Sequence, residues 1–152
     1  MEFTGNRQGS RREAPRHNSQ FDTLGRIPPR DKDLEEAVLG ALMLERDAYT
    51  TVCDILKPDS FYEPANQKIY QAIQSLGAAQ KPIDMLTVTE QLRLNGELES
   101  VGGPVFISEL TSRVASGANV EYHARIVAQK YLARELITFA SNIEGKAFDE
   151  SN

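Results

Sequence analysis

The sequence lacks tryptophan and contains a single cysteine, Cys53. One cysteine cannot close a disulfide within the chain or build a cysteine zinc site. The two histidines, His17 and His123, share no metal-ligand spacing with each other or with Cys53. We therefore expect neither a disulfide framework nor a bound metal, which fits a reducing compartment.

Long apolar runs are also missing. No stretch approaches the roughly 20 residues that a membrane-spanning helix needs, and the N-terminus lacks the apolar segment of a signal peptide. The 152 residues, 40% of them hydrophobic, suffice for one domain with a real core. The sequence predicts a soluble, cytoplasmic protein without membrane contact.

Residue patterns for common catalytic sites are absent as well. A phosphate loop needs a glycine, four residues, a glycine, a lysine and a hydroxyl residue, and Gly145-Lys146-Ala147 lacks the first glycine and the hydroxyl. Gly102-Gly103 follows no β-branched run and lacks the third glycine of a dinucleotide site. His123 is expected to be a partly exposed helical histidine. A small hydrolase would need a nucleophile with a nearby base, and the sequence offers no such set. We expect no catalytic residue and no cofactor site in this chain.

Charge is distributed unevenly along the chain. Residues 1–32 hold seven Lys and Arg against four Asp and Glu, whereas residues 33–152 hold ten against eighteen. Because nonspecific nucleic-acid affinity comes from clustered cations, the acidic body is expected to bind little DNA. Residues 1–30 have too few apolar side chains to offset the entropy of ordering them, and we predict a disordered basic arm. Its arginines are either a weak nucleic-acid contact or a solubilising tail.

The rest of the chain is expected to be all-α. Apolar residues recur at helical spacing between proline, glycine and capping residues. The expected helices run from Asp31 or Asp33 to about Glu45, from about Asp47 to Leu56, from Pro64 to a stop at Gly77, from a cap at Asp84 to Asn95-Gly96, from Gly102-Gly103-Pro104 to near Val114, and from Val120 to about Gly145.

Several residues carry local expectations. Asp33 with Glu36 resembles a capping box, and Gly40 inside a helix suggests close approach of a neighbouring helix. The pairs Glu35/Glu36 and Glu97/Glu99 are interpreted as solvated charges. Phe61 and Tyr62 are expected to pin a turn to the core, because a base-stacking role would need basic neighbours.

Residues 82–110 predict a structural joint between two short helices. Asp84 is placed to cap the first of them, and Leu86, Thr89, Leu92 and Arg93 follow at helical spacing. Gly102 and Gly103 tolerate unusual backbone angles, and Pro104 fits a first helical turn. A positive backbone angle at Gly103 would make its replacement by valine destabilising.

The last helix is expected to outgrow the domain. A head formed by residues 31–118 would contact its first half through Val120, Ala124, Val127 and Tyr131. Its second half, within residues 119–148, remains apolar with little chain left to cover it. We predict that something outside this chain covers this half. The candidate self-association residues are Tyr131, Leu132, Leu136, Ile137, Ala140 and Ile143.

Six ordered segments carry a family resemblance. They are 36–44 (EAVLGALML), 59–62 (DSFY), 67–70 (QKIY), 82–87 (PIDMLT), 98–103 (LESVGG) and 118–120 (ANV). With them, residues 30 to about 150 resemble the N-terminal domain of bacterial DnaB-type replicative DNA helicases. The arm, residues 1–29, lies outside the resemblance.

The resemblance implies a helical head followed by a long hairpin that pairs with a neighbour's hairpin. Such domains form a collar, a trimer of dimers, on a hexameric ring, and dock the C-terminal domain of primase and in some cases the helicase loader. The return helix, the linker and the motor with its ATP and magnesium site would lie outside this chain. The expected role is a non-catalytic scaffold of an ATP-dependent DNA helicase in a bacterial cytoplasm. The alternative is a free-standing helical adaptor or the helicase-binding domain of a primase.

Overall fold

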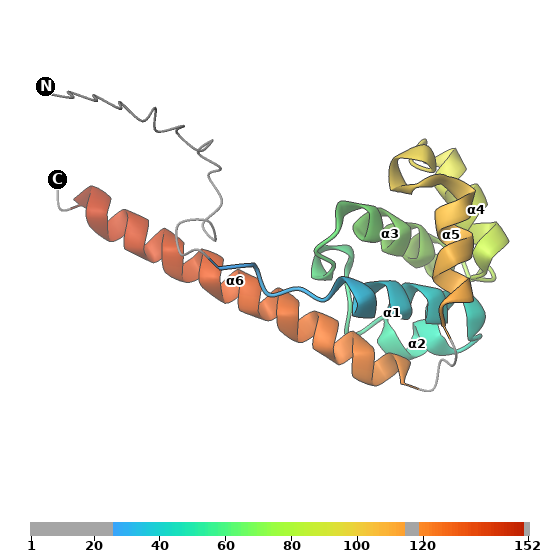
Figure 1. Ribbon diagram of the computed structural model, residues 1–152, viewed down its shortest axis with the longest axis horizontal. Helices are drawn as coiled ribbons and strands as arrows, with labels where there is room; N and C mark the ends of the chain where they lie inside the picture. The colour runs from blue at the N-terminus through green and yellow to red at the C-terminus, as the bar shows by residue number, and fades with distance from the viewer. Residues whose placement is uncertain (1–25, 115–118, 151–152) are drawn as a thin grey trace, which may run out of the picture.

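The computed structural model describes residues 26–114 and 119–150, whose regular elements are all helices, with no strand among them. The expected all-α fold is confirmed. Figure 1 shows a cluster of short helices and one long helix that leaves it. The elements are α1 (Lys32–Leu44), α2 (Ala48–Val52), the 3-10 turn η2 (Pro58–Ser60), α3 (Pro64–Ala78), α4 (Met85–Leu94), the 3-10 turn η3 (Glu99–Val101), α5 (Gly103–Ser112) and α6 (Val120–Glu150).

Helix α1 is the centre of the head and contacts α2, α3, α4, α5 and α6. It begins after Asp31, whose carboxylate accepts a hydrogen bond from the backbone N–H of Leu34 at 3.0 Å. The capping box expected from Asp33 and Glu36 is therefore wrong, because Asp33 lies inside the helix. Because other helices surround α1, it is buried on several sides, and Val38, Leu39 and Leu42 are among its buried residues.

The interpretation of Glu35 and Glu36 as solvated charges was wrong, because both side chains are buried. Glu35 is 2% exposed and accepts hydrogen bonds from Tyr62 N (2.8 Å), Glu63 N (3.3 Å) and Asn66 Nδ2 (3.1 Å). Glu36 accepts one from Arg113 Nη1, 2.9 Å away at the end of α5. The burial is tolerated because distant donors satisfy each carboxylate.

Gly40 is where α1 and α5 approach each other. A Cβ atom at this position would lie 2.2 Å from the carbonyl oxygen of Leu110 and 2.5 Å from Val114 Cγ2. The predicted close approach of a neighbouring helix is confirmed, and the neighbour is α5.

Two predicted helix ends were wrong. Helix α2 stops at Val52 and not near Leu56, because the N–H groups of Ile55 and Leu56 both bond back to the carbonyl of Val52 and turn the chain. Helix α3 continues through Gly77 to Ala78 and is closed by Gln80, which takes a positive φ of 56°.

The joint around α4 and α5 has the predicted caps. Asp84 Oδ1 accepts from Thr87 N at 2.8 Å, and Thr87 Oγ1 accepts from Asp84 N at 2.9 Å. Gly102 and Gly103 have φ of 115° and 73°, so the expected positive angles are present. The helical spacing is confirmed, and α4 faces the head through Val88 and Leu92, which are buried, while Leu86 is 75% exposed.

Helix α6 is 31 residues long and continues through Gly145 to Glu150, beyond its predicted end. At 1.5 Å per residue it measures about 46 Å. Figure 1 shows its first half beside α1 and α2 and its second half extending away from the head. Within the described residues, no helix is long and apolar enough to cross a bilayer.

Candidate assembly interface

The first half of α6 belongs to the core of the head. Val120, Ala124 and Val127 are buried at spacings of four and three residues, and α6 packs on α1, α2 and η2. His123 lies beside this stripe and is half-buried, as predicted. The spacing fixes which side of α6 faces the head, and therefore which side remains free further along.

Arg134 is the last buried residue of this contact, at 9% exposure. Its Nη1 donates a hydrogen bond to the carbonyl of Pro29 at 2.7 Å, and its Nη2 donates to the carbonyl of Ser60 at 3.1 Å. Burial lowers the pKa of the guanidinium from its usual value, and the Glu35 carboxylate opposes that shift. Arg134 thus joins α6 to two segments that lie far away in sequence.

Aromatic rings surround this arginine. The Arg134 Cζ atom lies 5.4 Å from the ring centre of Tyr62 and 5.7 Å from that of Tyr131, and Arg30 covers the Tyr62 ring at 4.9 Å. Such cation–π contacts favour arginine at partly desolvated positions. The expected anchoring role of the aromatic turn is confirmed, because Phe61 is fully buried and Tyr62 packs against both arginines.

The predicted arm, residues 1–30, falls mostly outside the described residues, which begin at residue 26. Its last residues run along α6 in Figure 1, where Pro29 accepts the Arg134 hydrogen bond and Arg30 covers Tyr62. These contacts hold the segment before α1 on the same side of α6 as the head.

On another side of α6, four large apolar side chains at regular spacing are exposed. Leu132, Leu136, Phe139 and Ile143 are 58%, 59%, 65% and 53% exposed. Their spacing of four, three and four residues is that of a coiled-coil seam, which meets a partner helix by knobs-into-holes packing. We call these four residues the α6 seam.

Three alanines run along one edge of the seam. Ala133, Ala140 and Ala147 follow each other at seven-residue intervals, so each occupies the same heptad position. Small side chains beside a seam permit close approach of a second helix. Burying a large apolar side chain contributes about 1.5–3 kcal/mol, so four such residues provide a substantial driving force for association.

The predicted self-association residues divide between two sides of α6. Leu132, Leu136 and Ile143 belong to the seam, and Ala140 is exposed beside it. Tyr131 and Ile137 are half-buried, and the ring of Tyr131 lies 5.1 Å from Lys57 Nζ of the head. Phe139 was missed, although its position three residues after Leu136 and seven after Leu132 is the signal that identifies it.

The remaining candidate residues lie elsewhere. Asp84, Gly102 and Gly103 are within the head, at the ends of α4 and α5. No group of three His, Cys, Asp or Glu residues in the described parts of the chain could hold a metal ion. The α6 seam is hydrophobic and carries no reactive group, so what this surface can do is bind another surface.

The chain is similar to known proteins over most of its length. A sequence profile described as "DnaB-like helicase N terminal domain" matches residues 27–129. The chain is 45% identical over 141 residues to the replicative DNA helicase DnaB of Rhodothermus marinus, which covers 93% of this chain and 15% of that protein. It is 42% identical over 118 residues to the replicative DNA helicase DnaC of Bacillus subtilis, with coverage of 78% and 26%. The chain therefore spans a small part of the length of these relatives.

A solved structure shows that the similarity extends to the fold. The crystal structure of the N-terminal domain of DnaB helicase from Mycobacterium tuberculosis superposes with a TM-score of 0.80 at 36% sequence identity. The superposition covers 82% of this chain and 89% of that one. The similarity extends over most of both chains and is not limited to a local motif.

Proposed function

This chain belongs to the DnaB-like helicase N-terminal domain family, and on that basis we propose that it is a non-catalytic collar domain that assembles the subunits of a replicative DNA helicase. Assembly proceeds through α6, first to dimers and then to a trimer of dimers around the hexamer. The α6 seam carries this proposal, because it presents a helical apolar surface that the head does not cover.

The surrounding geometry supports the same role. Arg134 and the buried stripe of Val120, Ala124 and Val127 fix the first half of α6 on the head. The second half therefore projects in a defined direction, so a partner helix meets the seam without having to order it. Ordering flexible groups costs conformational free energy on association, and a rigid helix avoids much of that cost.

The proposal extends to the parent protein and its partners. Unwinding of DNA, with ATP and magnesium, is carried out by a motor outside this chain. The collar recruits the C-terminal domain of primase and also contacts the helicase loader, while its acidic body binds little DNA. These roles are the ones that the family resemblance implies, and family membership supports them.

Sedimentation of the purified chain tests the assembly role. Leu136→Asp with Ile143→Asp places two charges in the seam, and we expect the mass to fall to that of a monomer. A milder variant of α6 is Leu136→Asp with Ile137→Asp, which changes one seam residue and one half-buried neighbour and should weaken association less. An unchanged mass in the first variant would refute the interface.

The matched control adds the same two charges to another side of α6. Ser141→Asp with Gly145→Asp lies off the seam, and a side chain at Gly145 would meet no atom within 4 Å. We expect this variant to sediment as the unaltered chain does. If it also dissociates, the added charge and not the seam controls assembly.

Two further measurements test the other parts of the proposal. The purified chain should hydrolyse no ATP, and turnover that copurifies with it through every step would overturn the non-catalytic role. Mixed with a cognate primase C-terminal domain, the chain should co-elute from a sizing column. Separate elution at concentrations well above those in a cell would remove primase recruitment from the proposal.

A further inference from the structure

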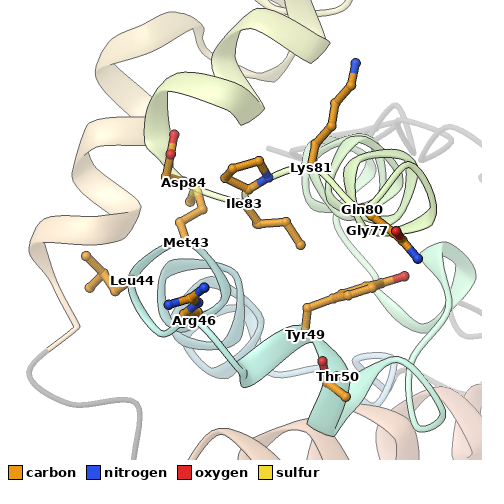
Figure 2. A pocket seen from close by; sticks show the side chains of 11 residues that line it. Met43, Leu44, Arg46, Tyr49, Thr50, Gly77, Gln80, Lys81, Ile83 and Asp84 are labelled. Carbon is orange, nitrogen blue, oxygen red and sulfur yellow. The ribbon is translucent and has the colours of Figure 1, made fainter.

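A cleft of about 610 Å³ opens on the head, at the C-terminal end of α1. Figure 2 shows it between the ends of α1 and α2 on one side and the connection from α3 to α4 on the other. Its floor is apolar and is formed by Met43, Ile83 and the ring of Tyr49. Neither α6 nor the segment before α1 lines this cleft, so the assembly interface does not use it.

The floor depends on a glycine in α3. A Cβ atom at Gly77 would lie 2.2 Å from Tyr49 Cε1, so the missing side chain lets the ring approach the helix this closely. Burial raises the pKa of Tyr49, which keeps its hydroxyl protonated and able to donate a hydrogen bond. The ring thus offers an apolar face to the cleft and one polar group near it.

The residues that line the cleft carry more positive than negative charge, whereas residues 33–152 as a whole are acidic. Arg46 and Lys81 lie on opposite sides of the cleft, and neither forms an ion pair with any described residue. Asp84 is the one carboxylate of the lining, and its Oδ1 already accepts the capping hydrogen bond from Thr87 N. Glu45 and Asp47 flank Arg46 in sequence and lie outside the lining.

The rim carries a strained residue. Gln80 is the one non-glycine residue with a positive φ in the described parts of the chain. Glycine would close α3 at this position with less strain, because a side chain disfavours this backbone angle. Strained residues cluster at binding sites, so the position of Gln80 beside the cleft makes its side chain a candidate contact for a ligand.

We propose that this cleft is a docking site for an acidic segment of a partner protein that inserts one apolar side chain onto the Met43–Tyr49–Ile83 floor. The carboxylates of the segment lie against Arg46 and Lys81, and the Gln80 amide hydrogen-bonds its backbone. Charge complementarity selects this occupant, since the cleft is a cationic spot on an acidic body. The site is separate from the α6 seam and stands independently of the assembly role.

Selection from a random peptide display library on the intact chain tests this site. Enriched peptides should carry Asp or Glu around a single apolar residue, and they should shift the amide NMR signals of Thr50 and Ile83. No enrichment, or enrichment of peptides without acidic residues, would overturn the proposal.

Matched charge reversals then locate the binding. Arg46→Glu with Lys81→Glu should weaken the selected peptide about tenfold or more. Arg26→Glu with Lys32→Glu changes the net charge equally at exposed positions outside the cleft and should leave the affinity within about twofold. Equal affinities of the two variants for the peptide would show that the cations of the cleft do not bind it.

Two more variants exclude an effect of misfolding. Gln80→Gly should raise the melting temperature and yet weaken the peptide severalfold, whereas a purely structural Gln80 predicts no loss of binding. Glu45→Gln with Asp47→Asn removes repulsion beside Arg46 and should tighten binding. If Arg46→Glu with Lys81→Glu instead dissociates the chain in sedimentation, a second copy occupies the cleft and the partner segment is ruled out.

Discussion

The guanidinium of Arg134 on α6 donates a hydrogen bond to the carbonyl oxygen of Ser60 in η2, across 3.1 Å and 74 positions of sequence. The same group donates to Pro29, so one side chain fastens the projecting helix to the aromatic turn and to the segment before α1. These two hydrogen bonds therefore fix the direction in which α6 leaves the head.

Replacing Arg134 with methionine should destabilise the chain by about 1–3 kcal/mol, because a buried carbonyl loses its donor. Arg134→Lys should recover part of the loss, since an ammonium cannot reproduce the two-pronged geometry. Urea unfolding measures both. Arg125→Met is the control, because Arg125 pairs with Glu121 at the exposed surface of the same helix and should cost less than about 1 kcal/mol. Equal losses at the two positions would contradict the anchoring role.

Replacing Glu35 with alanine should cost about 3 kcal/mol, because two backbone N–H groups after η2 and the Asn66 amide in α3 lose their acceptor. Glu35→Gln retains one acceptor oxygen and should cost less. Chemical unfolding gives both values. Glu90→Ala removes a carboxylate whose side chain is exposed and is the neutral comparison; a Glu35→Ala variant as stable as this one would show that water replaces the carboxylate.

Two glycines in helices should respond in opposite directions to alanine. Gly40→Ala places a Cβ against the Leu110 carbonyl of α5 and should cost about 1–3 kcal/mol by overpacking. Gly145→Ala fills open space on α6 and should stabilise the helix by up to about 1 kcal/mol. Thermal unfolding distinguishes the two, and a stabilising Gly40→Ala would mean that α1 and α5 can separate without penalty.

A substitution at Gly103 tests the joint at the start of α5. Its φ of 73° disfavours a side chain, while the nearest atom to an added Cβ is Glu99 Oε2 at 3.6 Å. The cost of Gly103→Val should therefore come from the backbone alone and reach about 1–2 kcal/mol. Gly103→Asn should cost less, because asparagine adopts this angle more readily. Similar melting temperatures for the two variants would show that the angle relaxes.

Tyr70 makes stability sensitive to alkali. It is fully buried, donates a hydrogen bond to the Leu56 carbonyl at 3.0 Å, and has its pKa raised above the usual range by burial. The unfolded chain ionises this hydroxyl near pH 10 while the folded chain keeps it protonated. The free energy of unfolding should hold below that pH and fall above it. Tyr70→Phe should flatten the fall in urea titrations at successive pH values, and an unchanged slope would assign it to other groups.

Local signals in the sequence were sufficient for the caps and for much of the seam. Asp84, Gly96 and the glycine pair at the start of α5 act within a few residues, so their types identify their roles. Leu132, Leu136 and Ile143 follow a repeat that is readable along one helix. The predicted all-α fold followed from these local patterns.

Contacts between distant residues could not be predicted in this way. Glu35 looked solvated because its donors are 27 to 31 positions away. Arg134 gave no signal at all, since its acceptors are 74 and 105 positions away. The α3 end was misplaced because Gly77 accommodates the Tyr49 ring of another helix, while Gln80 takes the angle expected of a glycine.

The 31-residue α6 also acts as a lever. From Arg134 to the end of the helix at Glu150, the arm is about 24 Å long at 1.5 Å per residue. A tilt of about 10° at the anchor would move the far end by about 4 Å, close to the 5.4 Å pitch of one helical turn. Small displacements around Tyr62 and Ser60 are therefore magnified at the tip, where they shift the register of any partner helix.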